Sequence, residues 1–208
     1  AAESAMPSLR SQRSKQEKSS YKNLPSISGR VEAEFLKTYL LYESIAPFRV
    51  LKPFEAVIPW DRSSGGLLSS ETAELHGYIH LSRWLRQAED VWDKHSKGTM
   101  TLLERIDYHG ELSAQFPTAK IRVLYPKSAT RPVSAVIRDD TIIIDQSLYW
   151  NACGEEEARY LSSIINSKIP IGRVRHLQSQ GEWGPRDLHK LIWTLPVPHF
   201  DLSQSLHR

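Results

Sequence analysis

The apolar residues of this chain change their spacing near residue 119, and no other feature of the sequence constrains the fold as strongly. Before that point, residues 71–97 repeat apolar side chains at helical intervals. After it, Lys120-Ile-Arg-Val-Leu-Tyr alternates in polarity as a strand does, and Thr141-Ile-Ile-Ile has the composition of a buried strand. The sequence therefore predicts an α+β fold.

Helix boundaries can be predicted from capping residues. Ser70 is the expected N-cap of the 71–97 helix, and Gly98 lies beyond its end. Three glutamates open a second helix over residues 155–166, because carboxylates stabilise the positive end of a helix dipole. A short helix is expected to begin near Val31, and another to run from Pro185 through Ile192. The apolar face expected for the 71–97 helix consists of Leu75, Tyr78, Ile79, Leu85, Ala88 and Trp92.

The remaining segments favour short strands and turns. Prolines break the region around Phe48-Arg-Val-Leu and Ala56-Val-Ile, and Ser63-Ser-Gly-Gly is typical of a turn. We expect residues 133–137 and 141–144 to form a hairpin around Asp139-Asp140, with Leu148-Tyr-Trp as a further strand. The prediction is a small, mostly antiparallel sheet packed by helices, with a basic linker over residues 1–28 and one domain over residues 29–208.

Charge is unevenly distributed, although the net charge is only +3. Residues 61–118 hold six Lys/Arg against nine Asp/Glu, whereas residues 119–208 hold twelve against nine. The single cysteine, Cys153, excludes an internal disulfide, and no apolar run approaches the roughly 18 residues of a membrane helix. We therefore expect a cytoplasmic protein whose flanks are more basic than its middle.

Catalytic motifs are sparse. The sequence contains neither a glycine-rich cofactor turn nor an Asn/Asp/Ser-Pro-Pro-aromatic turn, so we expect no catalytic residues and no cofactor in this chain. His76 and His80 are spaced to share one helix face, but the glutamate of a metalloprotease motif is missing, and we expect no metal. Asp107, His109 and Glu111 are interpreted as loop residues. Cys153 is interpreted as an inert thiol, although its place before a helix N-terminus can lower its pKa.

Two segments combine cations, hydroxyls, amides and aromatic side chains as nucleic-acid surfaces do. In residues 122–131, cations suit phosphates, and hydroxyls can donate to phosphates or base edges. In residues 173–190, glutamine amides suit adenine, and cations suit guanine or phosphate. The candidate DNA-binding residues are Arg122, Lys127, Ser128, Thr130, Arg131, Arg173, Arg175, Gln178, Gln180, Trp183, Arg186 and Lys190.

Several blocks of residues 29–202 also carry a family resemblance. They are Val31-Glu-Ala-Glu-Phe-Leu, Ala46-Pro-Phe-Arg, Ile58-Pro-Trp-Asp, the Leu85-to-Trp92 helix, Lys120-Ile-Arg-Val-Leu-Tyr, Ile144-Asp-Gln-Ser-Leu-Tyr-Trp, Ala158-Arg-Tyr-Leu-Ser-Ser-Ile-Ile-Asn-Ser, Gly181-Glu-Trp-Gly-Pro-Arg-Asp and Leu195-Pro-Val-Pro. In this order they resemble the C-terminal target-recognition region of adenine-specific DNA methyltransferases of restriction-modification and phage-defence systems.

The resemblance implies a division of labour between two parts of a larger protein. An N-terminal catalytic domain outside this chain would bind S-adenosylmethionine and hold the Asn-Pro-Pro-aromatic turn. The present chain would bind double-stranded DNA and help rotate the target adenine out of the duplex, at an unstacking cost of a few kcal/mol. On its own it would transfer no methyl group.

Two other functions remain open from the residues. A protein-interaction module could dock a catalytic or defence-system partner through the acidic middle and the 71–97 helix. A metal hydrolase built on His76 and His80 would require bound metal.

Overall fold

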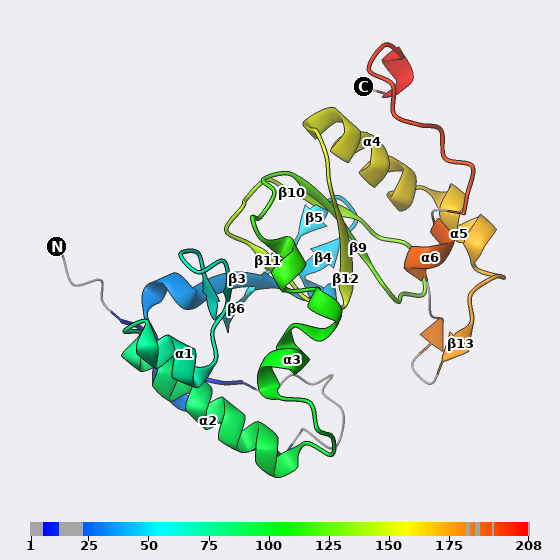
Figure 1. The fold of residues 1–208 in the computed structure, drawn as a ribbon. Helices are drawn as coiled ribbons and strands as arrows, with labels where there is room; N and C mark the ends of the chain where they lie inside the picture. Colours follow the sequence, from blue (N-terminus) through cyan, green and yellow to red (C-terminus); the bar gives the residue numbers. More distant parts are fainter. Residues whose placement is uncertain (1–5, 13–22, 182–183, 186–187, 193, 208) are drawn as a thin grey trace. The chain divides into compact units, whose positions relative to one another are not determined.

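The computed structural model describes residues 6–12, 23–181, 184–185, 188–192 and 194–207 (Figure 1). It has an α+β fold with small, mostly antiparallel sheets, as the sequence predicts. The chain divides into two compact units. Unit 1 comprises Ala1–Lys37 and Glu55–Ala114, and unit 2 comprises Thr38–Phe54 and Gln115–Arg208.

Unit 1 is mainly helical. Its elements are β1 (Ser8–Arg10), β2 (Ser28–Arg30), the 3-10 turn η1 (Ala33–Phe35), β7 (Trp60–Asp61), β8 (Gly66–Leu67), α1 (Ser70–Leu75), α2 (Ile79–His95), α3 (Leu102–Ile106) and the 3-10 turn η3 (Tyr108–Gly110). Three elements lie where the chain passes between the units: β3 (Leu36–Leu40), β6 (Phe54–Val57) and the 3-10 turn η4 (Ser113–Gln115). The unit 1 core consists of Val31, Phe35, Leu68, Ala73, Leu81, Trp84 and Leu85.

The segment expected to be a basic linker contributes to this unit where it is described. Strand β1 pairs antiparallel with β2, with Leu9 opposite Gly29. Leu9 and Ile27 also pack against the unit 1 core. Strand β2 itself spans the boundary expected near residue 28, so the described part of residues 1–28 includes a strand.

The prediction of one continuous helix over residues 71–97 is wrong. Gly77 adopts a φ of 84°, a left-handed conformation that glycine tolerates best, and it separates α1 from α2. Leu75, placed on the buried face by the helical pattern, is therefore 84% exposed. The prediction of a short helix beginning near Val31 is also wrong, because only η1 is helical there and the chain continues into β3.

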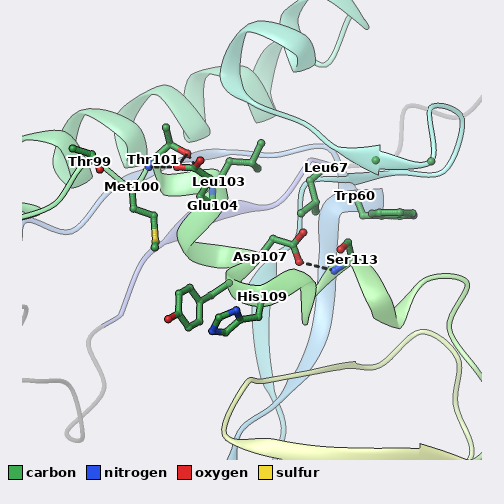
Figure 2. Close-up of a pocket in the computed structure, with 13 residues that line it drawn as sticks. Trp60, Leu67, Thr99, Met100, Thr101, Leu103, Glu104, Asp107, His109 and Ser113 are labelled. Carbon is green, nitrogen blue, oxygen red and sulfur yellow. Dashed lines mark hydrogen bonds between the residues drawn. The ribbon is translucent and has the colours of Figure 1, made fainter.

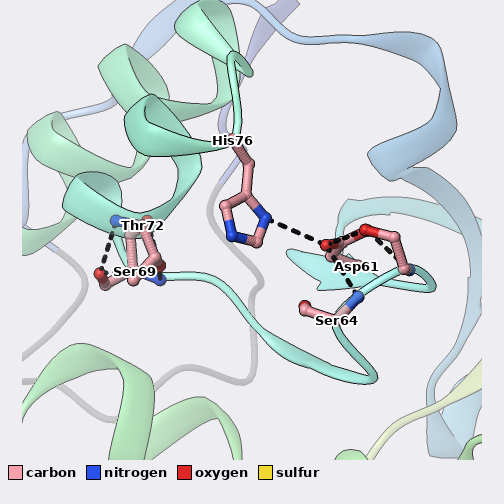
Figure 3. A network of polar contacts seen from close by, with 6 residues as sticks. Asp61, Ser64, Ser69, Thr72 and His76 are labelled. Atoms are coloured by element: carbon pink, nitrogen blue, oxygen red, sulfur yellow. Dashed lines mark hydrogen bonds and ion pairs between the residues drawn. The ribbon is translucent and has the colours of Figure 1, made fainter.

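A local side chain caps the start of α1, and a distant side chain caps the start of α2. The N-cap of α1 is Ser69 rather than Ser70, and its hydroxyl accepts from the Thr72 amide across 3.2 Å (Figure 3). Helix α2 has no capping side chain of its own. The Glu32 carboxylate instead accepts from the amides of His80 and Leu81 across 3.0 and 2.8 Å, so it stabilises the helix N-terminus.

The predicted turn over residues 63–66 is confirmed as the connection between β7 and β8. The Asp61 carboxylate accepts from the Ser63 and Ser64 amides across 3.0 and 3.1 Å, and Gly65 adopts a φ of 68°. His76 lies beside the same carboxylate, with 3.1 Å between its Nδ1 and Asp61 Oδ2 (Figure 3). The hydrogen bonds to Ser63 hold the pKa of Asp61 well below its usual range.

Unit 2 is built around strand β9. Its remaining elements are the 3-10 turn η2 (Tyr42–Ser44), β4 (Ile45–Ala46), β5 (Arg49–Val50), β9 (Arg122–Pro126), β10 (Ala135–Ile137), β11 (Ile143–Ile144), β12 (Leu148–Ala152), α4 (Glu155–Asn166), α5 (Lys168–Val174), β13 (Gln180–Gly181), β14 (Gly184–Pro185), α6 (Leu188–Ile192) and the 3-10 turn η5 (Ser205–His207). Strand β9 pairs antiparallel with both β10 and β12.

Both faces of β9 are covered. Leu124 faces a cluster with Leu40, Ile45, Ala135, Ile137, Ile144 and Leu148. Val123 and Tyr125 face a second cluster formed with α4, α5 and α6, which lie on that side of the sheet (Figure 1). All five residues of β9 are buried as a result.

The hairpin predicted from residues 133–137 and 141–144 is wrong. Strand β10 pairs with the preceding β9, whereas β11 pairs in parallel with β3, with Ile143 opposite Tyr39. The Gln115 side chain binds both peptide groups of Ile144, across 2.8 and 2.9 Å, and so fixes β11 away from β10. Of the remaining helices, α4 is confirmed over residues 155–166, α5 was not predicted, and Pro185 lies in β14 ahead of α6.

Candidate nucleic-acid interface

The loop that follows β9 presents most of the first group of predicted residues at the surface. Ser128, Thr130 and Arg131 are exposed, and the Lys127 amide donates to the Ser147 carbonyl across 3.0 Å. The Lys127 ammonium lies 5.3 Å from the centre of the Tyr149 ring. A cation in that position is attracted to the ring quadrupole, and this attraction orients Lys127 beside Tyr149.

Tyr149 was not among the predicted site residues. Its ring stacks on Tyr125 with 5.7 Å between centroids and an interplanar angle of 30°. Tyr125 is buried in the core, whereas Tyr149 is 41% exposed. The core therefore supports a partly exposed aromatic ring beside a lysine, which is a pairing that nucleic-acid surfaces use for bases and phosphates.

Helix α5 and the residues after it present part of the second group. Val174 is fully buried in the cluster beneath α5, while Arg173 and Arg175 on either side of it are exposed. Successive helical residues are rotated by about 100°, so the two arginines leave the chain on opposite flanks of the buried Val174. Lys190, on α6, is exposed as well.

The structure joins the two groups through Gln178. Its side-chain amide donates to the Ala129 carbonyl across 3.2 Å, and its side chain is only 7% exposed. Ala129 in turn packs against the cluster that contains Val174, Leu188 and Ile192. The loop of Lys127 and Arg131 is therefore tethered to the segment that carries Arg173 and Arg175. We call these two segments, residues 127–131 and 173–178, the tethered surface.

Two predicted contacts are corrected by burial. Arg122 is fully buried, and its Nη2 donates to the carbonyls of Asp139 and Ile142 across 2.9 and 2.8 Å. Burial lowers the pKa of Arg122 to about 10, against the raising effect of the Asp139 and Asp140 charges. This guanidinium fixes the 139–142 loop and cannot reach a duplex. Gln178 likewise uses its buried amide within the protein, so it positions the loop rather than contacting adenine.

The other predicted contacts are described only in part or not at all. Gln180 lies in β13, and its side chain is outside the described residues. Trp183 and Arg186 also lie outside the described residues. These three contacts remain predictions.

The distribution of acidic residues is a signal that the sequence analysis missed. Residues 112–138 contain five Lys/Arg and no Asp/Glu, and residues 158–181 contain four Lys/Arg and no Asp/Glu. Each tethered segment lies inside one of these stretches. The surface therefore has local positive charge that the net charge of +3 conceals, and such a patch attracts polyanions.

Unit 1 contains an open cleft of about 770 Å³ with a different character (Figure 2). Trp60, Tyr108 and His109 supply aromatic lining, and Glu104 and Asp107 supply carboxylates. Both carboxylates accept hydrogen bonds from backbone amides. Asp107 accepts from the Leu112 and Ser113 amides across 3.0 and 2.8 Å, and Glu104 accepts from the Thr101 amide across 2.7 Å. The bond of Glu104 caps α3, and the bonds of Asp107 hold the turn that follows, which agrees with the interpretation of Asp107 as a loop residue.

The histidine pair is divided by the break at Gly77. His76 ends α1 beside Asp61, and His80 lies in the first turn of α2. Within the residues that the structure describes, no three His, Cys, Asp or Glu side chains are grouped as metal ligands would be. The pair therefore does not share the single helix face that the spacing indicated.

Cys153 does not have the lowered pKa that its place before α4 can produce. Burial raises its pKa to about 11, and the nearby charges of Glu157 and Glu155 act in the same direction. The thiol is therefore protonated near neutral pH. In the described part of the chain, no helix has the length and apolar character needed to cross a membrane.

No protein-family model matches this chain, and no curated protein matches it. Its function must therefore be inferred from the chemistry of the tethered surface.

Proposed function

We propose that this chain binds double-stranded DNA through the tethered surface of unit 2. The observation that carries the proposal is the Gln178–Ala129 hydrogen bond, because it joins two acid-free segments that each present cations. Lys127, Arg131, Arg173 and Arg175 would contact phosphates, and Ser128 and Thr130 would donate to phosphates or base edges.

We further propose that this DNA-binding unit is the target-recognition region of an adenine-specific DNA methyltransferase. Its support is the resemblance of residues 29–202 to such regions together with the tethered surface. Adenine must leave the stacked duplex before its amine can be methylated, and contacts with the DNA backbone offset the cost of unstacking. In this proposal S-adenosylmethionine binds to a separate catalytic domain, which is the protein partner of this chain.

Charge reversal tests the DNA-binding surface. The double substitution Arg173→Glu and Arg175→Glu should weaken the binding of a short labelled duplex, measured by fluorescence anisotropy, by about a hundredfold, or roughly 2.7 kcal/mol. The matched control is Lys94→Glu with Lys97→Glu, which makes the same charge change at two exposed positions of unit 1. Equal affinities for wild type and the unit 2 variant would exclude the tethered surface.

The methyltransferase assignment has a separate test. The coding sequence immediately upstream should encode a glycine-rich turn after a strand and an Asn-Pro-Pro-aromatic turn, because methyl transfer to an amine requires both. A duplex-binding chain whose gene lacks both turns would retain the DNA-binding proposal and contradict the enzymatic one.

A further inference from the structure

Phe48 occupies a position in the turn between β4 and β5 that the fold does not favour for an aromatic residue. Ile45 pairs with Val50 and Ala46 with Arg49, so Pro47 and Phe48 form a two-residue turn. Phe48 adopts a φ of 63°, a left-handed conformation in which glycine or asparagine is usual. Its side chain is 62% exposed, so core packing does not explain the choice of phenylalanine.

The turn is held firmly to the body of unit 2. The Phe48 amide donates to the Ser134 carbonyl across 2.8 Å, and the Asn166 amide group donates to the same oxygen across 2.9 Å. The Ser134 amide donates back to Asn166 Oδ1 across 2.8 Å. Three segments of the chain therefore fix the backbone beneath an exposed ring.

This anchor ties the turn to the segment that follows the 127–131 loop. Ser134 lies three residues after Arg131 along the chain, and strand β5 lies beside β10 (Figure 1). The hairpin also lies in a third acid-free stretch, because residues 44–54 contain Arg49 and Lys52 but no Asp or Glu. Both cations are exposed. An apolar ring is thus presented on a cationic part of unit 2.

We propose that Phe48 inserts between stacked bases of the bound duplex while Arg49, Lys52 and the tethered surface hold the phosphates. This inference rests on the proposed DNA binding and adds a local unstacking function to it. Rigid apolar side chains flanked by cations open base steps in this way, and the backbone contacts offset the cost of unstacking. Exposed Val50 and Leu51 extend the apolar surface of the hairpin. Residues 44–54 provide only basic charges around the ring, and such a local excess of positive charge attracts a polyanion.

The test uses the full chain and duplexes that carry 2-aminopurine at successive positions, because this base fluoresces more strongly when it is unstacked. Wild type should increase the fluorescence at one or more positions. Phe48→Ala should remove most of that increase while changing the Kd by less than about threefold, since the phosphate contacts remain. Phe48→Trp should retain the increase, and Leu202→Ala, which removes a 56% exposed side chain elsewhere in unit 2, should leave it unchanged.

Phe48→Gly guards against a folding artefact, because glycine accepts the turn's φ while removing the ring. It should behave as Phe48→Ala does and retain the wild-type circular dichroism spectrum. The insertion of Phe48 would be contradicted if Phe48→Gly gave the full fluorescence increase, or if wild type bound the duplex without any increase. Either result would leave the proposed DNA binding unaffected. If wild type binds no duplex and the hairpin instead retains a protein partner, both proposals fail.

Discussion

The side-chain amide of Gln178 donates to the backbone carbonyl of Ala129 across 3.2 Å, and this bond links two segments that lie 49 residues apart in the sequence. Neither segment is a regular element over the linked residues, so the bond and the small cluster beneath it define their relative position. The proposed DNA surface depends on this link, because it brings cations of both segments onto one part of unit 2.

Removing the donor of this bond should loosen the tethered surface. Gln178→Met keeps the length of the side chain and should cost about 1 kcal/mol of unfolding free energy, with a loss of DNA affinity of roughly threefold to tenfold. The salt dependence of binding should also weaken, because fewer cations hold their phosphates. Gln87→Met is the control, since Gln87 donates to the Arg83 carbonyl within α2. Stability loss in Gln178→Met with unchanged affinity and salt dependence would limit Gln178 to a purely structural role.

Arg122 should affect stability rather than DNA contact. Arg122→Ala leaves the Asp139 and Ile142 carbonyls without their donor and should lower the free energy of unfolding by about 3 kcal/mol, as measured by urea denaturation. Arg122→Met should cost less, because it fills the space without burying a charge. Arg131→Ala, at an exposed position, should change stability by no more than about 0.5 kcal/mol. A fully stable Arg122→Ala variant with weakened DNA binding would restore Arg122 as a contact residue.

The acid stability of unit 2 should depend on Glu155. Hydrogen bonds from Arg138, and then from Arg159, lower the pKa of Glu155 from 4.5 to about 2. Because the pKa is depressed in the folded state, the stabilisation is present above pH 4.5 and is lost as the pH falls from 4.5 toward 2. Glu155→Gln should therefore flatten the fall of the urea midpoint in this pH range. Glu156→Gln, at the exposed neighbouring position, serves as the control, and parallel curves for wild type and Glu155→Gln would contradict the assignment.

The break between α1 and α2 can be tested with a pair of glycines. Gly77→Ala places a side chain at a φ of 84° and should lower the free energy of unfolding by about 1 kcal/mol. Gly172→Ala, inside α5 and with open space around the added methyl group, should raise it by up to about 1 kcal/mol. A Gly77→Ala variant as stable as wild type would mean that the break has another cause.

Local signals in the sequence predicted some elements well. Three glutamates followed by Ala158, Leu161 and Ile165 identify α4, because the dipole and the apolar spacing agree within one short segment. The pairing of β9 with two strands and the parallel pairing of β11 depend on distant residues, among them Gln115, which no local pattern reveals.

The candidate site was predicted unevenly for the same reason. Alternation in Lys120-Ile-Arg-Val-Leu-Tyr indicated one exposed face for β9, but core residues cover both faces and bury Arg122. Composition correctly placed Arg131, Arg173 and Arg175 at the surface, because short helices and loops expose cations readily. The roles of Gln178 and Tyr149 required the fold, since their partners lie 49 and 24 residues away.

The salt dependence of duplex binding tests the central claim most directly. If Lys127, Arg131, Arg173 and Arg175 each neutralise one phosphate, these four cations should contribute about −3 to −4 to the slope of log affinity against log salt, and replacing all four by alanine should make the slope less negative by that amount. The measurement is a titration between about 50 and 200 mM salt for both proteins. A slope near zero for wild type, or an unchanged slope in the fourfold variant, would contradict DNA binding by the tethered surface.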